Sequence, residues 1–232
     1  MTGISVWFAD FCDLFYKCFI KDDRYRLLVS GVGVTIKVSL LAVLIGILIG
    51  MLVAMSNLSR NKLFKAIGGI YTDVIRGTPS VTQLMVIYFV FFASVNLNKW
   101  IIAAIAFGVN SGAYVSEIIR GGILSVDHGQ MEAGRSLGLN AFQTMTRIVI
   151  PQAVKNIFPA LCNEFIVLIK ETAIVGYVGL MDIQKAGDFI KSATYEPGMP
   201  LFGTAVIYYV LIKILTLTLR QVENHLRKSD AR

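Results

Sequence analysis

Two long runs of residues without any charge constrain this chain more than any other feature of its sequence. They cover residues 38–59 and 77–98, and each holds 22 consecutive uncharged positions. A helix needs about 20 apolar residues to cross the hydrocarbon core of a bilayer. Both runs are therefore predicted to contain membrane spans.

Three further segments extend this pattern. Residues 100–116 and 197–212 are shorter uncharged runs, and residues 149–181 are mostly apolar although they carry four charged side chains. The whole chain is 55% hydrophobic and 16% charged, with a mean hydropathy of +0.66, whereas soluble domains carry about 25% charged residues. We predict an all-α polytopic membrane protein with five spans, at residues 30–56, 68–95, 100–122, 150–178 and 201–221.

The distribution of basic residues predicts the orientation of these spans. The net charge is +7, and basic side chains gather after the first span and in the C-terminal tail. Cytoplasmic loops carry an excess of Lys and Arg, so both segments are expected in the cytoplasm and the N-terminus outside. Little chain remains for the solvated basic face that nucleic-acid binding needs, which argues against a nucleic-acid partner.

The segment before the first span differs from a cleaved signal peptide. It has acidic residues within its apolar stretch and no basic start, so an amphipathic helix lying along the membrane surface is expected instead. The three cysteines show no metal-ligand spacing, and no metal site is predicted. The expected domains are a surface segment at residues 1–29, a transmembrane domain at 30–222 and a cytoplasmic tail at 223–232.

The stretch GQMEAGRSLGLN, residues 129–140, lies in the largest hydrophilic interruption, residues 120–147. Its glycines have nearly the spacing of a phosphate-binding P-loop, but Arg135 stands where that motif needs Lys. The residues before it are the end of a membrane helix, and the interruption is too short for a nucleotide-binding domain. The chain is therefore not expected to be an enzyme or to hydrolyse ATP.

The same stretch predicts two short helices joined by a glycine turn. Gly138 favours a helix end, and Asn140 can cap a second helix that runs from Ala141 until Pro151. Ala133 and Gly134 would give a small-residue surface that another protein can approach closely. Such a projection can serve as a docking knob for a soluble partner, or it can be an ordinary intracellular loop.

A family resemblance favours the first alternative. The pattern Glu132-Ala-Gly-x3-Gly138-x9-Ile148-x-Ile150-Pro151 resembles the E-A-A-x3-G-x9-I-x-L-P motif of ABC importer permeases, with Gly in place of the second Ala and Ile in place of Leu. In that family the motif forms a coupling helix, here at about residues 126–149, which sits in a cleft of a separate ATPase subunit. The ATPase-coupling residues that this implies are Glu132, Ala133, Gly134, Arg135, Ser136, Leu137 and Gly138.

The rest of the chain resembles the polar-amino-acid uptake branch of these permeases. The segments that carry this resemblance are Gly31–Ser39, Asp73–Pro79, Ser111–Ile123 and Lys170–Ala173, which has Ala where the branch has Ser. Together with the EAA-type motif they extend over roughly residues 30–220. The resemblance implies the type I importer permease fold, with ATP and Mg²⁺ bound by the partner ATPase and no cofactor on this chain.

The fourth predicted span carries an unusual row of polar residues. Asn156, Asn163 and Lys170 recur every seven residues, and Glu164 and Glu171 follow the same step. Seven residues are nearly two helical turns, so the row forms one stripe. Charges inside a bilayer cost about 2.5–3.5 kcal/mol and usually face a cavity or the bundle interior. The stripe is therefore expected to face the central axis, in a helix that Pro159 kinks.

The third span adds polar residues at middle depth and, with Glu117, toward its cytoplasmic end. Together the two spans offer donors for a carboxylate and acceptors for an ammonium group, which is what a zwitterionic amino acid needs. The candidate substrate-binding residues are Asn110, Ser111, Tyr114, Glu117, Asn163, Glu164, Lys170 and Glu171.

Structural roles compete with binding at several of these positions. Glu117 and Arg120 are three residues apart and can neutralise each other. Lys170 and Glu171 can form a structural pair, whereas Glu164 has no obvious partner in the sequence. The pair Asp73 and Arg76 is expected to hold the entry of the second span before the break at Pro79. Gly46-x-x-x-Gly50 is typical of close helix packing.

The sequence therefore predicts the permease subunit of an ATP-driven importer for polar or charged amino acids, in a prokaryotic cytoplasmic (inner) membrane. The expected partners are a pair of ABC ATPase subunits, a second permease as homodimer or paralogous heterodimer, an extracytoplasmic amino-acid-binding protein, the amino acid and membrane lipid. Two alternatives remain: a secondary transporter or channel driven by an ion gradient, and a non-transporting scaffold. The acidic candidates hint at cationic amino acids, but the sequence does not decide which amino acid is carried.

Overall fold

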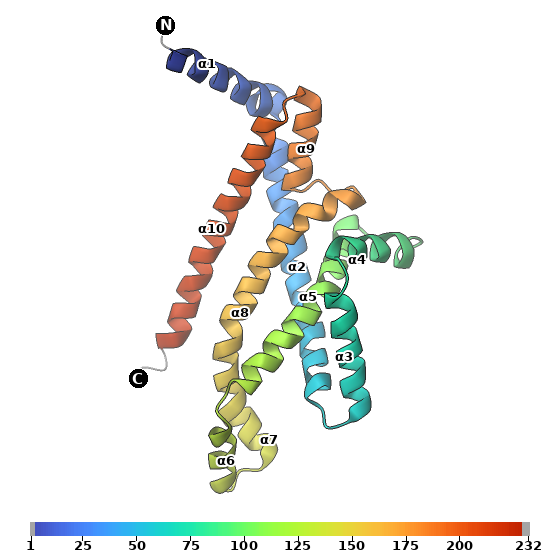
Figure 1. The fold of residues 1–232 in the computed structure, drawn as a ribbon, viewed down its shortest axis with the longest axis vertical. Coiled ribbons are helices and arrows are strands. Elements are labelled where there is room, and N and C mark those ends of the chain that lie inside the picture. The colour runs from blue at the N-terminus through green and yellow to red at the C-terminus, as the bar shows by residue number, and fades with distance from the viewer. Residues whose placement is uncertain (1–2, 229–232) are drawn as a thin grey trace.

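A computed structural model describes residues 3–228, and every regular element in that range is a helix (Figure 1). The α-helices are α1 (Gly3–Phe15), α2 (Tyr25–Leu58), α3 (Lys62–Arg76), α4 (Ser80–Val86), α5 (Lys99–Leu124), α6 (His128–Ser136), α7 (Ala141–Thr144), α8 (Ile150–Glu171), α9 (Ile183–Thr194) and α10 (Gly198–Lys228). Wider π-helical turns follow α1, α4 and α7 at Tyr16–Ile20, Ile87–Phe91 and Met145–Val149, and 3₁₀ turns occupy Lys21–Asp23 and Thr172–Val178. The predicted all-α architecture is confirmed.

Helices α2 and α5 form the centre of the fold, and glycines let them approach closely. A Cβ atom added at Gly50 would lie 2.5 Å from Val115 Cγ1, and one added at Gly46 would lie 2.9 Å from Ser111 Oγ. The two glycines lie one turn apart on the buried face of α2. The expectation that they serve close helix packing is confirmed.

The second predicted span is a broken helix. Helix α3 and the segment Ser80–Phe91 meet at 105°, and Pro79 lies at the break because it has no N–H and excludes helical backbone from the residue before it. The Gln83 side chain bridges the break, with Nε2 donating to the carbonyl oxygens of Ile75 at 2.7 Å and Thr78 at 3.1 Å. These carbonyls would otherwise lack partners in a segment expected to be dry.

The helix that begins at Ala141 continues beyond Pro151, which corrects the predicted end. α7, the wide turn Met145–Val149 and α8 follow one another without interruption up to Glu171. Pro151 follows the wide turn and lies in the first turn of α8, where the missing N–H and the ring of a proline are tolerated. α8 also contains Pro159, and its regular part ends seven residues before the predicted span boundary at residue 178, because residues 172–178 form a 3₁₀ turn.

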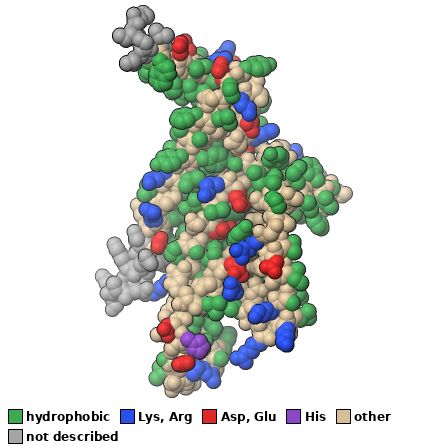
Figure 2. All heavy atoms as spheres, viewed as in Figure 1, with side chains coloured by type: hydrophobic (Ala, Val, Ile, Leu, Met, Phe, Trp, Pro, Cys, Tyr) green, Lys and Arg blue, Asp and Glu red, His purple; other side chains and the backbone are tan. Residues whose placement is uncertain are grey.

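Within residues 3–228, three helices are long and apolar enough to cross a membrane, namely α2, α5 and α10, and the bent α3–α4 pair makes a fourth when it is counted as one span. α8 has 22 residues, but it is not one of these apolar helices because it carries the polar stripe. That α8 crosses the membrane therefore remains a prediction. Figure 1 shows α10 leaving the top of the bundle beside α9 and ending apart from the other helices. Figure 2 shows hydrophobic side chains spread over α1 and α4.

Candidate functional site

The polar centre of the molecule lies where α5 meets α8. Ser111 Oγ donates a hydrogen bond of 2.7 Å to Oε1 of Glu164. Both residues are buried, with Ser111 at 0% and Glu164 at 8% exposure. Two of the predicted site residues are therefore brought together, and Glu164 has a neutral partner that lies 53 residues away in the sequence.

The other members of the α8 stripe divide into two groups. Asn156, Asn163 and Lys170 are exposed, whereas Glu171 is half-buried. Adjacent positions on a helix differ by about 100°, so Glu164 turns toward α5 and Glu171 is partly covered, while the row of Asn156, Asn163 and Lys170 stays uncovered. The expected single stripe is thus two neighbouring rows. Within the described residues, Lys170 and Glu171 form no ion pair with each other.

Asn110 binds the side chain that bridges the break between α3 and α4. Its Nδ2 donates 2.9 Å to Oε1 of Gln83, and the Gln83 amide nitrogen holds the end of α3. Both side chains are buried. Asn110 therefore positions α4 against α5, and Gln83 is a residue that sequence reasoning missed. A glutamine inside a 22-residue uncharged run was the signal that could have identified it.

Glu117 lies in a cluster of charges at the α3–α5 contact. Its carboxylate accepts from Arg120 Nη2 at 2.7 Å and from Arg120 Nε at 3.3 Å. Arg76 Nη1 lies 4.0 Å from the same carboxylate, and its guanidinium lies 5.6 Å from the centre of the Tyr114 ring. The neutralised pair that the spacing of Glu117 and Arg120 suggested is present. Arg76 pairs with Glu117 and not with Asp73, contrary to expectation.

This cluster borders a hollow at the end of α2, α3 and α5, with a volume of about 470 Å³. A larger hollow, of about 850 Å³, lies between the end of α5 and α8, and Asn156 and Pro159 are among its lining residues. Of the exposed row on α8, Asn156 therefore borders this hollow. Among residues 3–228 no three His, Cys, Asp or Glu side chains are placed to hold a metal ion.

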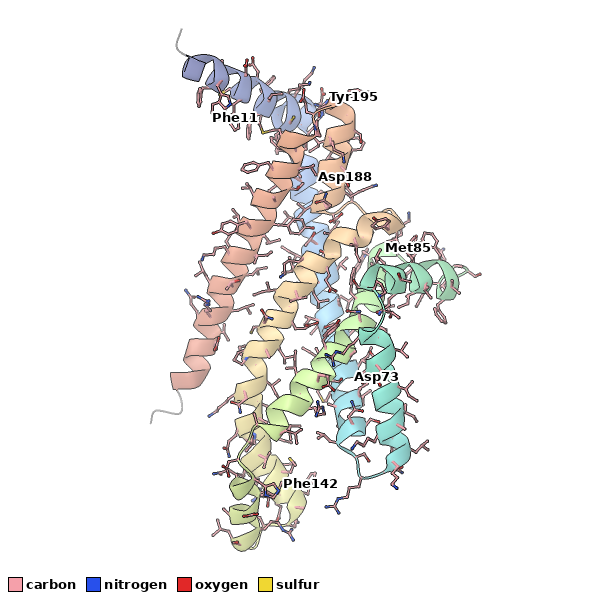
Figure 3. All side chains as sticks on the ribbon, viewed as in Figure 1. Phe11, Asp73, Met85, Phe142, Asp188 and Tyr195 are labelled. Atoms are coloured by element: carbon pink, nitrogen blue, oxygen red, sulfur yellow. The ribbon has the colours of Figure 1, made fainter. Side chains whose placement is uncertain are left out.

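The helix–turn–helix projection is present at the end of the bundle opposite α1, where Figure 3 labels Phe142. Asp127 Oδ1 caps α6 by accepting from Gly129 N at 2.6 Å. Gly138 has φ +83°, which ends α6 as predicted. Asn140 and Gln143 form a reciprocal capping box, with bonds of 2.8 and 2.9 Å, that starts α7.

Gly134 corrects one expectation about this projection. It is buried, and an added Cβ would lie 2.5 Å from Thr144 Cγ2. The glycine therefore serves the contact of α6 with α7 inside the projection, while Ala133 is exposed. The exposed surface of the projection instead carries two large apolar side chains, Leu137 and Phe142, which are 81% and 76% exposed.

Known proteins match this chain over most of its length. The family model described as "Binding-protein-dependent transport system inner membrane component" matches residues 46–228. A putative glutamine transport system permease protein of Rickettsia bellii is 40% identical over 205 residues, covering 88% of this chain and 94% of the relative. The arginine transport system permease protein of Bacillus subtilis is also 40% identical, with the same coverage of both chains.

A solved structure matches the fold as well. It is the crystal structure of an amino acid ABC transporter with histidines, with a TM-score of 0.80 and 42% sequence identity. The match covers 87% of this chain and 94% of that chain.

Proposed function

This chain belongs to the family of binding-protein-dependent transport system inner membrane components, and we propose that it carries polar or charged amino acids into the cell as the permease subunit of an ATP-driven importer. The observation that carries this proposal is the α6–α7 projection, an exposed helix pair with a capped turn at the end of α5 and α8. The names of the glutamine and arginine permeases support the amino acid substrate.

The projection docks a separate ATPase, which binds ATP and Mg²⁺ and performs the hydrolysis. Phe142 is the main apolar contact, since aromatic side chains are enriched at the cores of interfaces, and Leu137 enlarges the apolar surface beside it. Glu132, Ala133, Arg135 and Ser136 are exposed around them and form the polar rim. Gly134 and Gly138 hold the shape of the turn. ATPase closure then moves α5 and α8, which continue directly from the projection.

Uptake of radiolabelled amino acid into vesicles with and without internal ATP tests the docking role. Glu132→Lys and Gly138→Trp abolish ATP-dependent uptake and co-purification of the ATPase. Arg60→Glu, a charge reversal in the exposed loop between α2 and α3, serves as the control and retains both. Uptake that persists in both variants and follows an ion gradient would instead establish the secondary-transporter alternative.

The substrate passes along the α5–α8 contact. The Glu164 carboxylate attracts the substrate ammonium or a cationic side chain, and Lys170 attracts the carboxylate. Asn110 and Glu117 act by positioning, through the helix break and the Arg120 cluster. The complete set of proposed site residues is Asn110, Ser111, Tyr114, Glu117, Asn163, Glu164, Lys170 and Glu171.

Loss of uptake in Glu164→Ala, with normal membrane insertion and normal ATPase binding, tests the substrate role. Ala removes both the charge and the hydrogen bond to Ser111. Competition by unlabelled glutamine, arginine and cystine identifies the substrate in the same assay. A variant that transports at the normal rate supports the scaffold alternative for this region and contradicts the proposed pathway.

A second permease chain completes the pathway. Asn156, Asn163 and Lys170 are exposed on a membrane-length helix, and polar side chains there require protein or water as neighbours instead of lipid. The second chain is a copy of this one or a paralogue. Purification in mild detergent separates the two cases, because a homodimer yields one permease band beside the ATPase.

The remaining partners follow from the orientation. With the N-terminus outside and the C-terminus in the cytoplasm, α9 and the start of α10 face the extracytoplasmic binding protein that delivers the amino acid. The membrane is the prokaryotic cytoplasmic (inner) membrane. Cysteine labelling from each side of sealed vesicles tests this orientation, with Cys12 on α1 accessible from the outside only.

A further inference from the structure

Helix α1 exposes four large aromatic side chains on one face. Trp7, Phe8, Phe11 and Phe15 are between 38% and 66% exposed, and the Trp7 and Phe11 rings stack with centroids 5.8 Å apart. Their spacing places them on one side of the helix. Asp10 and Asp13 fall on the opposite side. α1 is therefore amphipathic, and its apolar side has no neighbour within residues 3–228 that buries it.

The turn after α1 fastens this helix to the corner between α9 and α10. Phe19 is 7% exposed, and Gly203 on α10 makes room for it, because an added Cβ would lie 2.5 Å from the end of the Phe19 ring. Lys17 Nζ forms an ion pair of 2.9 Å with Glu196, just beyond α9. We call these contacts, Lys17–Glu196 and Phe19–Gly203, the corner latch.

The corner latch determines the position along the bundle at which α1 leaves it. Gly203 lies in the second turn of α10, next to Leu201 and Phe202, which are 40% and 67% exposed. α10 contains an 18-residue apolar window of which only 6% is buried by the rest of the structure. Figure 3 shows α1, on which Phe11 is labelled, at the end of the bundle where α10 begins. The end of α1 is therefore attached where the apolar part of α10 begins.

We propose that the aromatic face of α1 binds the interfacial region of the lipid bilayer and that the corner latch thereby ties α9 and α10 to the membrane surface. Trp and other aromatic side chains favour this region, and amphipathic helices lie in it with the apolar face buried. The occupant is lipid because the corner latch attaches α1 at the start of α10, a helix long and apolar enough to cross a membrane and little buried by the rest of the structure. Residues 3–16 contain two acids and no Lys or Arg, so the headgroups are zwitterionic ones.

With the orientation given under Proposed function, α1 lies in the outer leaflet, whereas lipid contact itself does not depend on that orientation. Lipid contact and leaflet can be tested separately, since lipid contact is measured with the chain in either orientation. α1 also precedes the segment matched by the family model, which begins at residue 46.

Tryptophan fluorescence of the full-length chain in phosphatidylcholine nanodiscs tests the proposal. The chain has two tryptophans, so Trp100→Phe leaves Trp7 as the only emitter, and Trp7→Phe provides the Trp100 control. Phosphatidylcholine brominated near the headgroup is compared with lipid brominated near the chain end. The expected result is strong quenching of Trp7 by the shallow bromine, weaker quenching by the deep one, and little quenching by aqueous acrylamide.

Other quenching patterns overturn the proposal. Quenching by acrylamide alone would place Trp7 in water, and protection from acrylamide and from both brominated lipids would place it against another protein chain. Phe11→Asp is expected to abolish the lipid quenching of Trp7, because a charge enters the aromatic face. The matched variant Asp13→Asn, on the polar face, is expected to leave the quenching unchanged, and equal loss in both variants would also contradict the proposal.

Discussion

Ser111 on α5 donates a hydrogen bond of 2.7 Å to the Glu164 carboxylate on α8. The bond joins two helices at the polar centre of the molecule, and both partners are buried. Ser111 also lies against α2, where Gly46 leaves room for its hydroxyl. One serine therefore connects the packing of the α2–α5 pair with the acid of the proposed substrate pathway.

Ser111→Ala is expected to lower the stability of the purified protein. The change leaves the buried Glu164 oxygen without its donor, which costs about 1–3 kcal/mol. Thermal unfolding in detergent measures the change. Ser116→Ala is the control, because the Ser116 hydroxyl is buried on the same helix but donates only to the carbonyl of Ala113, at 2.8 Å. Equal shifts in both variants would show that the bond to Glu164 contributes nothing specific.

The α2–α5 contact predicts that substituting two glycines of α2 has very different effects on stability. Gly50→Ala is expected to destabilise the fold by about 1–3 kcal/mol, since the new methyl group would overlap Val115. Gly33→Ala is expected to be neutral or to stabilise by up to about 1 kcal/mol, because nothing lies within 4 Å of the added atom and Ala favours helix. Unfolding temperatures of the two variants check this. A Gly50→Ala protein as stable as the Gly33→Ala protein would refute the close contact.

The sequence predicted those parts of the fold that depend on local chemistry. The end of α6 at Gly138 and the cap at Asn140 follow from backbone preferences of single residues. The partners of Asn110 and Ser111 could not be predicted, because they lie 27 and 53 residues away. Which row of the α8 stripe turns toward α5 is likewise decided by packing between helices. A five-residue wide turn before Pro151 has no signature in the residue types.

The α6–α7 projection predicts an epistatic pair. Gly134→Ala would restore the alanine of the EAA-type motif, yet the added atom would lie 2.5 Å from Thr144 Cγ2 and 3.1 Å from Thr144 Oγ1. We expect this variant to bind the ATPase more weakly, because α6 must shift away from α7. Pull-down of the ATPase by the tagged permease measures the effect.

The second substitution of this pair is Thr144→Ser. It removes the Cγ2 methyl group while keeping a hydroxyl that can donate to the Asn140 carbonyl, as Thr144 does at 3.0 Å. The double variant Gly134→Ala/Thr144→Ser is therefore expected to recover ATPase binding, and Thr144→Ser alone to bind normally. Additive losses in the double variant would contradict the geometry.

The corner latch predicts different reactivities for two cysteines that are six residues apart. Cys12 on α1 is exposed, whereas Cys18 is fully buried beside Phe19. Burial raises the pKa of the Cys18 thiol, so at a given pH less of it is the reactive thiolate. In a Cys162→Ser background, a maleimide at neutral pH is expected to modify Cys12 rapidly and Cys18 only slowly. The rate at which Cys18 is modified is expected to increase with pH, but only at higher pH values than for an exposed thiol.

Breaking the latch is expected to expose Cys18. Phe19→Ala empties the space beside Gly203, and Lys17→Glu places a second carboxylate next to that of Glu196. Either change is expected to speed modification of Cys18 while leaving Cys12 unchanged, and the exchange Lys17→Glu/Glu196→Lys is expected to restore protection because the ion pair is rebuilt. Mass spectrometry of the labelled protein distinguishes the two sites. If Cys18 stays protected in Phe19→Ala and Lys17→Glu alike, these contacts do not hold α1 to the corner between α9 and α10.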